Sequence, residues 1–145
     1  MKKVTALMAI LMTLVITSFA EPNEKVLKAF GTAFPNIAKV EWSGTNETPT
    51  AYFKMNNIQT RVSFDKEGNF LRSMRYYTEK ELPTNILFAI QKRYADKKVT
   101  GVTETSDAEG TTTYYIKMQD DKNWWTLKTS NGIAFEIYEK YKLQS

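Results

Sequence analysis

The stretch "AYFKM" at Ala51–Met55 returns as "YYIKM" at Tyr114–Met118, and this echo is the best indicator of the fold. In both copies apolar and polar side chains alternate, which is the period-two pattern of a half-buried β-strand. In the first copy Phe53 and Met55 share one side, and Tyr52 and Lys54 share the other. The echo therefore predicts two strands that hold the same place in two similar units.

A helical pattern precedes each copy. The stretches "EKVLKAFGTAF" and "ELPTNILFAIQKRY" each carry apolar residues on one helical stripe. The two stripes are related by a constant offset of 60 residues: Val26, Leu27, Phe30 and Phe34 in the first, and Ile86, Leu87, Ile90 and Tyr94 in the second. Pro35 ends the first helix and Pro83 lies near the start of the second, as the backbone limits of proline require.

Four alternating segments follow each helix, and in each we expect the apolar residues to face the core. In the first half these segments are "AKVEW", "AYFKM", a strand with Val62 and Phe64, and a strand with Phe70 and Met74. In the second half they are "KVTGVTE", "YYIKM", "WWTLK", and a last strand with Ile133, Phe135 and Ile137. We therefore expect an α+β fold of two tandem units, residues 21–79 and 80–145. Each unit has one helix packed on a four-stranded antiparallel sheet, and the two form one compact domain.

The first 20 residues have the pattern of a secretory signal peptide. Lys2 and Lys3 precede the apolar run "VTALMAILMTLVI", and small residues lead to a cleavage position near Ala20. An N-terminal membrane anchor is the alternative, but the apolar run is shorter than the roughly 20 residues that a spanning helix needs. We expect a periplasmic or secreted protein with no membrane anchor after cleavage.

Charge and composition narrow the chemistry. Without Lys2 and Lys3, the 20 basic residues fall to 18 against 16 acidic ones, so the net charge is only about +2 and does not favour a nucleic-acid partner. The chain has no His and no Cys. It therefore lacks the usual general base, the thiol nucleophile and the common zinc ligands, which argues against an enzyme.

Three stretches together resemble a known family. They are "F-x-x-x-FP-x-x-x-x-V-x-W" from Phe30 to Trp42, the "VSFDKEGNFL" hairpin, and "ELPTNILFAIQKRY". They are similar to the PepSY-like, β-lactamase-inhibitor-like family of exported bacterial proteins. The resemblance implies a pair of helix-plus-four-strand units, like the β-lactamase inhibitor protein, and for some members a response to calcium. This chain lacks that inhibitor's cysteines, and no stretch matches its enzyme-plugging loops, so inhibition does not follow from the fold.

The alternation also places aromatic and basic residues on the outward side of the strands. They are Tyr52, Lys54, Arg61, Arg75 and Tyr77 in the first half, and Tyr115, Lys117, Trp124, Lys128 and Tyr138 in the second. Tyr, Trp and Arg are enriched at binding hot spots, although aromatic residues also suit β-strands for structural reasons. We expect a non-enzymatic binding module for a protein or peptide, in its sharper form an inhibitor or regulator of a secreted enzyme. A glycan ligand is the alternative, because aromatic faces also stack sugars.

Two carboxylate groupings are weaker candidates. Asp65 and Glu67 in one turn, and Asp120 and Asp121 in another, are candidate calcium ligands, but both stretches also have the pattern of ordinary hairpin turns. Glu41, Glu104 and Glu136 lie on predicted strands and could form the acid–base pair of a glycoside hydrolase. Nothing in the sequence brings two of these glutamates together, so we expect no catalysis. We also expect no cofactor, and calcium bound at one of the two turns is the alternative.

Overall fold

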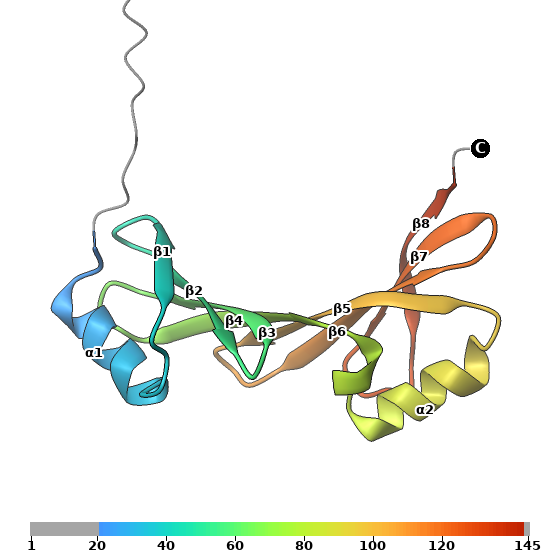
Figure 1. Ribbon diagram of the computed structural model, residues 1–145, viewed down its shortest axis with the longest axis horizontal. Coiled ribbons are helices and arrows are strands. Elements are labelled where there is room, and N and C mark those ends of the chain that lie inside the picture. The colour runs from blue at the N-terminus through green and yellow to red at the C-terminus, as the bar shows by residue number, and fades with distance from the viewer. Residues whose placement is uncertain (1–20, 144–145) are drawn as a thin grey trace, which may run out of the picture.

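The structure is a computed structural model, and it describes residues 21–143. The signal peptide expected in residues 1–20 lies outside the described residues. Two helices and eight strands follow one another in the order helix, four strands, helix, four strands (Figure 1). The elements are α1 Glu24–Ala33, β1 Val40–Gly44, β2 Pro49–Met55, β3 Ile58–Phe64, β4 Phe70–Tyr77, α2 Thr84–Arg93, β5 Lys98–Asp107, β6 Thr112–Gln119, β7 Asn123–Thr129 and β8 Glu136–Lys142, with a short 3-10 turn η1 at Glu79–Glu81.

The eight strands form one antiparallel sheet in sequence order from β1 to β8. The α+β class is as expected, but two separate four-stranded sheets do not form. The reason is that β4 pairs with β5 along its length, from Arg72 opposite Asp107 to Tyr77 opposite Val102. This pairing satisfies the backbone groups that would otherwise be exposed at two sheet edges. The halves are therefore joined by continuous backbone hydrogen bonding.

Both helices begin and end for local reasons. Asn23 caps α1, because its Oδ1 accepts a hydrogen bond from the backbone N–H of Val26 at 3.1 Å. Pro83 precedes α2 and supplies a carbonyl to the first turn. Each helix buries two side chains of its apolar stripe, Val26 and Phe30 in α1 and Ile86 and Ile90 in α2. Both helices pack on the same face of the sheet, at opposite ends (Figure 1).

Each helix lies over its own apolar cluster. The α1 cluster is built from Val26, Phe30, Ala51, Phe53, Val62 and Phe64, with Trp42 packed against it. The α2 cluster contains Leu82, Ile86, Ile90, Val102, Ile116, Met118 and Leu127, and it also contains Ile58 and Tyr77. Because Ile58 belongs to β3 and Tyr77 to β4, strands of the first half form part of the wall of the second core.

The fourth and eighth strands depart from the expected alternation. In β4 the pairing jumps from Phe64 opposite Phe70 to Ser63 opposite Arg72, so Leu71 is an extra residue in a β-bulge. The bulge reverses the two faces beyond it, and Met74 therefore lies opposite Arg61, away from the helices. In β8 the strand begins only at Glu136. Ile133 is 72% exposed and Ile137 is 55% exposed, so their expected place in the core is wrong.

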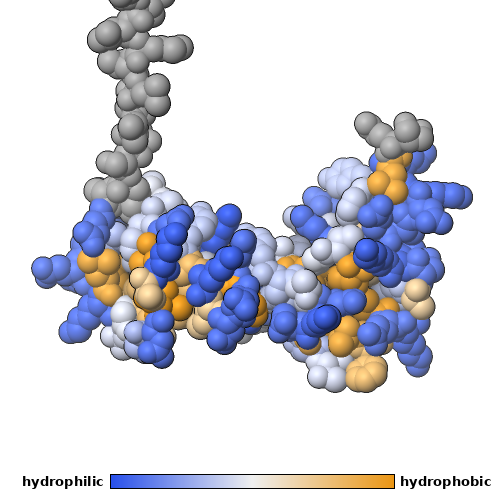
Figure 2. All heavy atoms as spheres, in the orientation of Figure 1, coloured by the Kyte–Doolittle hydropathy of each residue, from blue (hydrophilic) through white to orange (hydrophobic). Residues whose placement is uncertain are grey.

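The sheet has one face covered by helices and one face without them. We call the second face the open face. It carries alternate residues of each strand, among them Tyr52, Arg61, Tyr76, Tyr115 and Trp124. The outer strands β1 and β8 rise from the ends of the long middle strands, and a hollow lies between the raised ends on the side opposite α2 (Figures 1 and 2). The open face is therefore concave along the long axis. Within residues 21–143, neither helix is long and apolar enough to span a membrane.

Candidate functional site

At the end of the open face formed by the first four strands, one arginine lies between two tyrosines. The guanidinium carbon of Arg61 on β3 is 4.6 Å from the ring centroid of Tyr52 on β2 and 5.3 Å from that of Tyr76 on β4. Direct pairing of Tyr52 with Arg61 brings the first two together, and Tyr76 is a diagonal neighbour. Such cation–π contacts hold the guanidinium in a defined plane.

A depression of about 690 Å³ opens beside this arginine. We call it the Arg61 depression. It is lined by Asn36–Lys39 before β1, by Glu41, and by side chains of β2, β3 and β4 that include Tyr52, Lys54, Gln59, Arg61 and Tyr76. Of the predicted face residues, Tyr52, Lys54 and Arg61 are therefore brought together here. Tyr76 also lines the depression, although it was not among the predicted face residues.

At the other end of the open face, the second set of aromatic residues gathers on β6, β7 and β8. The rings of Tyr115 and Tyr138 meet edge to face, with centroids 5.1 Å apart, and Lys128 lies opposite Tyr115 on β7. Trp124, which is 40% exposed, pairs with Tyr141, which is 61% exposed. The predicted Lys117 lies on the same face and is exposed. Tyr141 was not among the predicted residues, because the last strand was placed too early.

Arg75 and Tyr77 do not belong to the open face, so their predicted placement is wrong. The bulge at Leu71 turns both toward the helix-covered side, where Tyr77 is 8% exposed in the α2 cluster. There Tyr77 Oη donates a hydrogen bond of 2.6 Å to Glu104 Oε2, and Arg75 Nη1 lies 3.1 Å from Glu104 Oε1. Burial, followed by this contact with Glu104, raises the pKa of Tyr77 well above its ordinary value.

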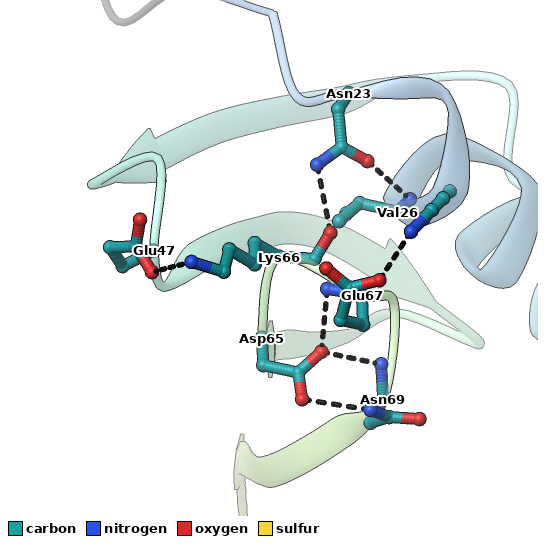
Figure 3. Close-up of polar contacts among 8 residues, drawn as sticks. Asn23, Val26, Glu47, Asp65, Lys66, Glu67 and Asn69 are labelled. Carbon is teal, nitrogen blue, oxygen red and sulfur yellow. Dashed lines mark hydrogen bonds and ion pairs between the residues drawn. The ribbon is translucent and has the colours of Figure 1, made fainter.

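The first calcium candidate, around Asp65 and Glu67, is a closed hydrogen-bonded turn (Figure 3). Asp65 accepts hydrogen bonds from the backbone N–H of Glu67 at 2.8 Å and from the backbone and side chain of Asn69. The hydrogen bonds from the side chain and backbone of Asn69, followed by that from Glu67, lower the pKa of Asp65. Glu67 pairs with Lys25 on α1, and the carbonyl of Lys66 accepts from Asn23 at 2.8 Å. The turn thus fastens the β3–β4 hairpin to the first turn of α1.

The second calcium candidate is organised around Asp120. Its carboxylate accepts from the backbone N–H groups of Lys122 at 2.9 Å and Asn123 at 2.7 Å, and from the indole N–H of Trp125 at 2.7 Å. Hydrogen bonds hold the pKa of Asp120 well below its ordinary value. The largest effect comes from the backbone, followed by the Trp125 indole and Lys97. Asp121 is exposed beside it. Across residues 21–143 no group of three carboxylates gathers in a way that could hold a metal ion.

Asp120 gives a prediction about acid stability. Because its pKa is lowered by folding, its contribution is present above the unfolded pKa near 3.8 and is lost as the pH falls below that value. Asp120→Asn should therefore lower the melting temperature at neutral pH. The difference from the unsubstituted chain should shrink in melts below about pH 4. Asp121→Asn is the matched control, and an equal loss in both variants would contradict the assignment.

The carboxylates considered for hydrolysis do not meet. Glu41 lies on the open face of β1, opposite Tyr52, and Glu104 lies on the helix-covered side of β5. Glu136 lies on β8, at the far edge of the sheet. Glu41 and Glu104 are on opposite faces and three strands separate β1 from β5, so no pair of these groups flanks a common cleft.

Several solved structures share this architecture. No protein-family model and no curated protein matches the chain. Among solved structures, a BLIP-like protein from Bacteroides fragilis superposes with a TM-score of 0.68 at 18% identity, over 89% of this chain and 92% of that one. A DUF2874 family protein from Bacteroides ovatus gives 0.66 at 22% identity over 84% and 88%. A "putative periplasmic" protein from Bacteroides eggerthii gives 0.65 at 21% identity over 84% and 89%.

These likenesses bear on the fold. The expected resemblance to the β-lactamase inhibitor protein is supported for the fold, because one of these structures is a BLIP-like protein. None of these three structures is described as PepSY-like, so that part stays a prediction. The chain therefore has a BLIP-like fold, an eight-stranded antiparallel sheet with two helices on one face.

Proposed function

We propose that the chain is an exported, non-enzymatic module that binds a protein or peptide on the open face of its sheet. The observation that carries the proposal is the gathering of exposed or half-exposed aromatic and basic side chains on this concave face. Tyr52, Arg61 and Tyr76 supply one end, and Tyr115, Trp124 and Tyr138 supply the other. Aromatic residues and arginine dominate the energetics of protein interfaces, because each combines a large contact area with a polar group.

The proposal includes the division into two helix-plus-four-strand units, each of which supplies one end of the face. The element order and the echo of "AYFKM" in "YYIKM" support this view. Export is supported by the signal-like pattern of residues 1–20 and by the likeness to a protein described as "putative periplasmic". The likeness to a BLIP-like protein favours a protein partner, and control of a secreted enzyme is the sharper form of the proposal.

The test is affinity capture from the periplasm of the source organism, with three matched proteins. We expect the unsubstituted chain and Phe88→Ala to capture the same partner, because Phe88 is 66% exposed on α2, away from the open face. The triple variant Tyr52→Ala/Tyr115→Ala/Trp124→Ala should reduce the affinity of the recovered partner at least about tenfold, since hot-spot truncations typically cost more than 1 kcal/mol each. Equal capture by all three proteins would refute the open face as the binding surface.

A glycan array separates the alternative ligand. Trp124 lies on the open face and is 40% exposed, whereas Trp42 and Trp125 pack against the two apolar clusters, so Trp124 is the tryptophan placed to stack on a sugar ring. A glycan signal that disappears with Trp124→Ala would replace a protein by a glycan as the ligand.

The calcium-responsive alternative is tested by measuring the melting temperature with and without calcium. A calcium-induced rise in melting temperature that Asp65→Asn or Asp120→Asn abolishes would establish that role.

A further inference from the structure

We infer that the Arg61 depression binds the side-chain carboxylate of Asp or Glu within an acidic segment of the partner. This inference rests on the proposed binding face and names the chemistry that one end of it recognises. Its starting point is the state of Arg61. This residue is exposed, and within residues 21–143 no carboxylate oxygen lies within ion-pair distance of its guanidinium.

Arg75 shows what the fold does with an arginine that serves structure. Its guanidinium carbon lies 5.4 Å from the ring centroid of Tyr77, an aromatic contact like those of Arg61. The neighbouring strand also provides Glu104, whose carboxylate receives Arg75 Nη1 at 3.1 Å and 3.3 Å. Arg61 has two aromatic neighbours and no such carboxylate. Glu104 neutralises the charge of Arg75 on the helix-covered face, whereas the charge of Arg61 on the open face can be neutralised by a ligand.

The two tyrosines prepare Arg61 for this contact. The two aromatic contacts engage the face of the guanidinium, and the N–H groups at its edge remain available to donate hydrogen bonds. A carboxylate matches this edge with two parallel charge-assisted hydrogen bonds. Because Tyr52 and Tyr76 already restrict the side chain, less rotamer entropy remains to be lost on binding.

The charges around the depression favour a segment with more than one carboxylate. Lys39, Lys54 and Arg61 line it, against Glu41 as the one acidic residue of the lining, so the rim carries a net positive charge. Its volume of about 690 Å³ lies in the range of sites that enclose small ligands or a few side chains. The lysines attract further acidic groups and accelerate encounter, whereas Arg61 provides the directional contact.

The experiment uses defined synthetic peptides and the purified chain. A short amidated peptide of alternating Glu and Ser is titrated by fluorescence anisotropy, and 15N NMR follows the Arg61 side chain. The comparison peptides replace Glu by Gln, once with an amidated end and once with a free C-terminal carboxylate. The protein variants are Arg61→Gln, Arg61→Lys and the control Arg72→Gln. Arg72 is exposed on the same face, opposite Ser63, and does not line the depression.

We expect the Glu peptide to bind and to shift the Arg61 side-chain signal. Arg61→Gln should weaken binding at least about tenfold, Arg61→Lys should weaken it by an intermediate factor, and Arg72→Gln should change it less than twofold. Equal binding of the amidated Gln peptide, or equal loss in Arg61→Gln and Arg72→Gln, would overturn the inference. Binding of the Gln peptide with a free carboxyl end as tightly as the Glu peptide would also overturn it. Partner capture through the open face can survive any of these results, so the two proposals fail separately.

Discussion

Glu104→Ala is expected to lower the free energy of unfolding by about 2–3 kcal/mol, because it leaves the buried Tyr77 and the half-buried Arg75 without their acceptor. The Glu104 side chain is 13% exposed and receives both Tyr77 Oη, at 2.6 Å, and Arg75 Nη1. Within the described part of the chain, Arg75 Nε is already buried without a hydrogen-bond partner, so the arginine has little means of adjusting. Urea denaturation, followed by circular dichroism, measures the loss.

Two comparisons make this result specific. Glu41→Ala removes an exposed glutamate from β1 and should change the free energy of unfolding by less than about 0.5 kcal/mol. A double-mutant cycle of Glu104→Ala with Tyr77→Phe should give a coupling energy of about 0.5–3 kcal/mol, as expected for residues in direct contact. If Glu104→Ala costs no more than Glu41→Ala, the Arg75–Glu104–Tyr77 contacts do not stabilise the middle of the sheet.

Phe30→Ala is expected to cost more, about 3–5 kcal/mol, because it opens a cavity at the centre of the α1 cluster. The Phe30 ring is 6% exposed, and its centroid lies 5.3 Å from those of Trp42 and Phe53, both in edge-to-face contact. The substitution removes these aromatic contacts together with the buried area. Trp42 belongs to this cluster, so its fluorescence reports on the damage during urea denaturation.

Phe88→Ala is the matched control, since it makes the same chemical change on the other helix at a side chain that is 66% exposed. It should alter stability by less than about 0.5 kcal/mol. Phe30→Leu keeps most of the buried volume and should fall between the two, at about 1–1.5 kcal/mol. A loss from Phe30→Ala no larger than that from Phe88→Ala would show that α1 does not depend on this cluster.

Local pattern predicts much of this fold, and the reasons are visible at particular residues. The apolar stripes of both helices and the alternation in "AYFKM" and "YYIKM" follow from side-chain periodicity alone. Tyr52 and Arg61 could also be placed side by side. Asn56 and Asn57 form a two-residue turn with positive φ, and such a turn sets the register of the hairpin.

Periodicity does not reveal which strands meet across the chain, or where one extra residue enters a strand. The pairing of β4 with β5 joins the two halves, and a period of two is compatible with it or with two separate sheets. The bulge at Leu71 moved Tyr76 onto the open face and Arg75 and Tyr77 away from it. Adjacent apolar residues at Phe70 and Leu71, directly after a tight turn, were the available signal for that bulge.

The unbroken pairing from β1 to β8 fixes the distance between the two ends of the open face. Backbone hydrogen bonds run from strand to strand between the Arg61 depression and the Tyr115–Tyr138 pair, so no linker lets these two ends approach or separate. Neighbouring strands are spaced about 4.8 Å apart, and that spacing sets the separation of the two contact points. A partner that touches both ends must present its groups at a matching span, so length as well as chemistry becomes a basis for selection.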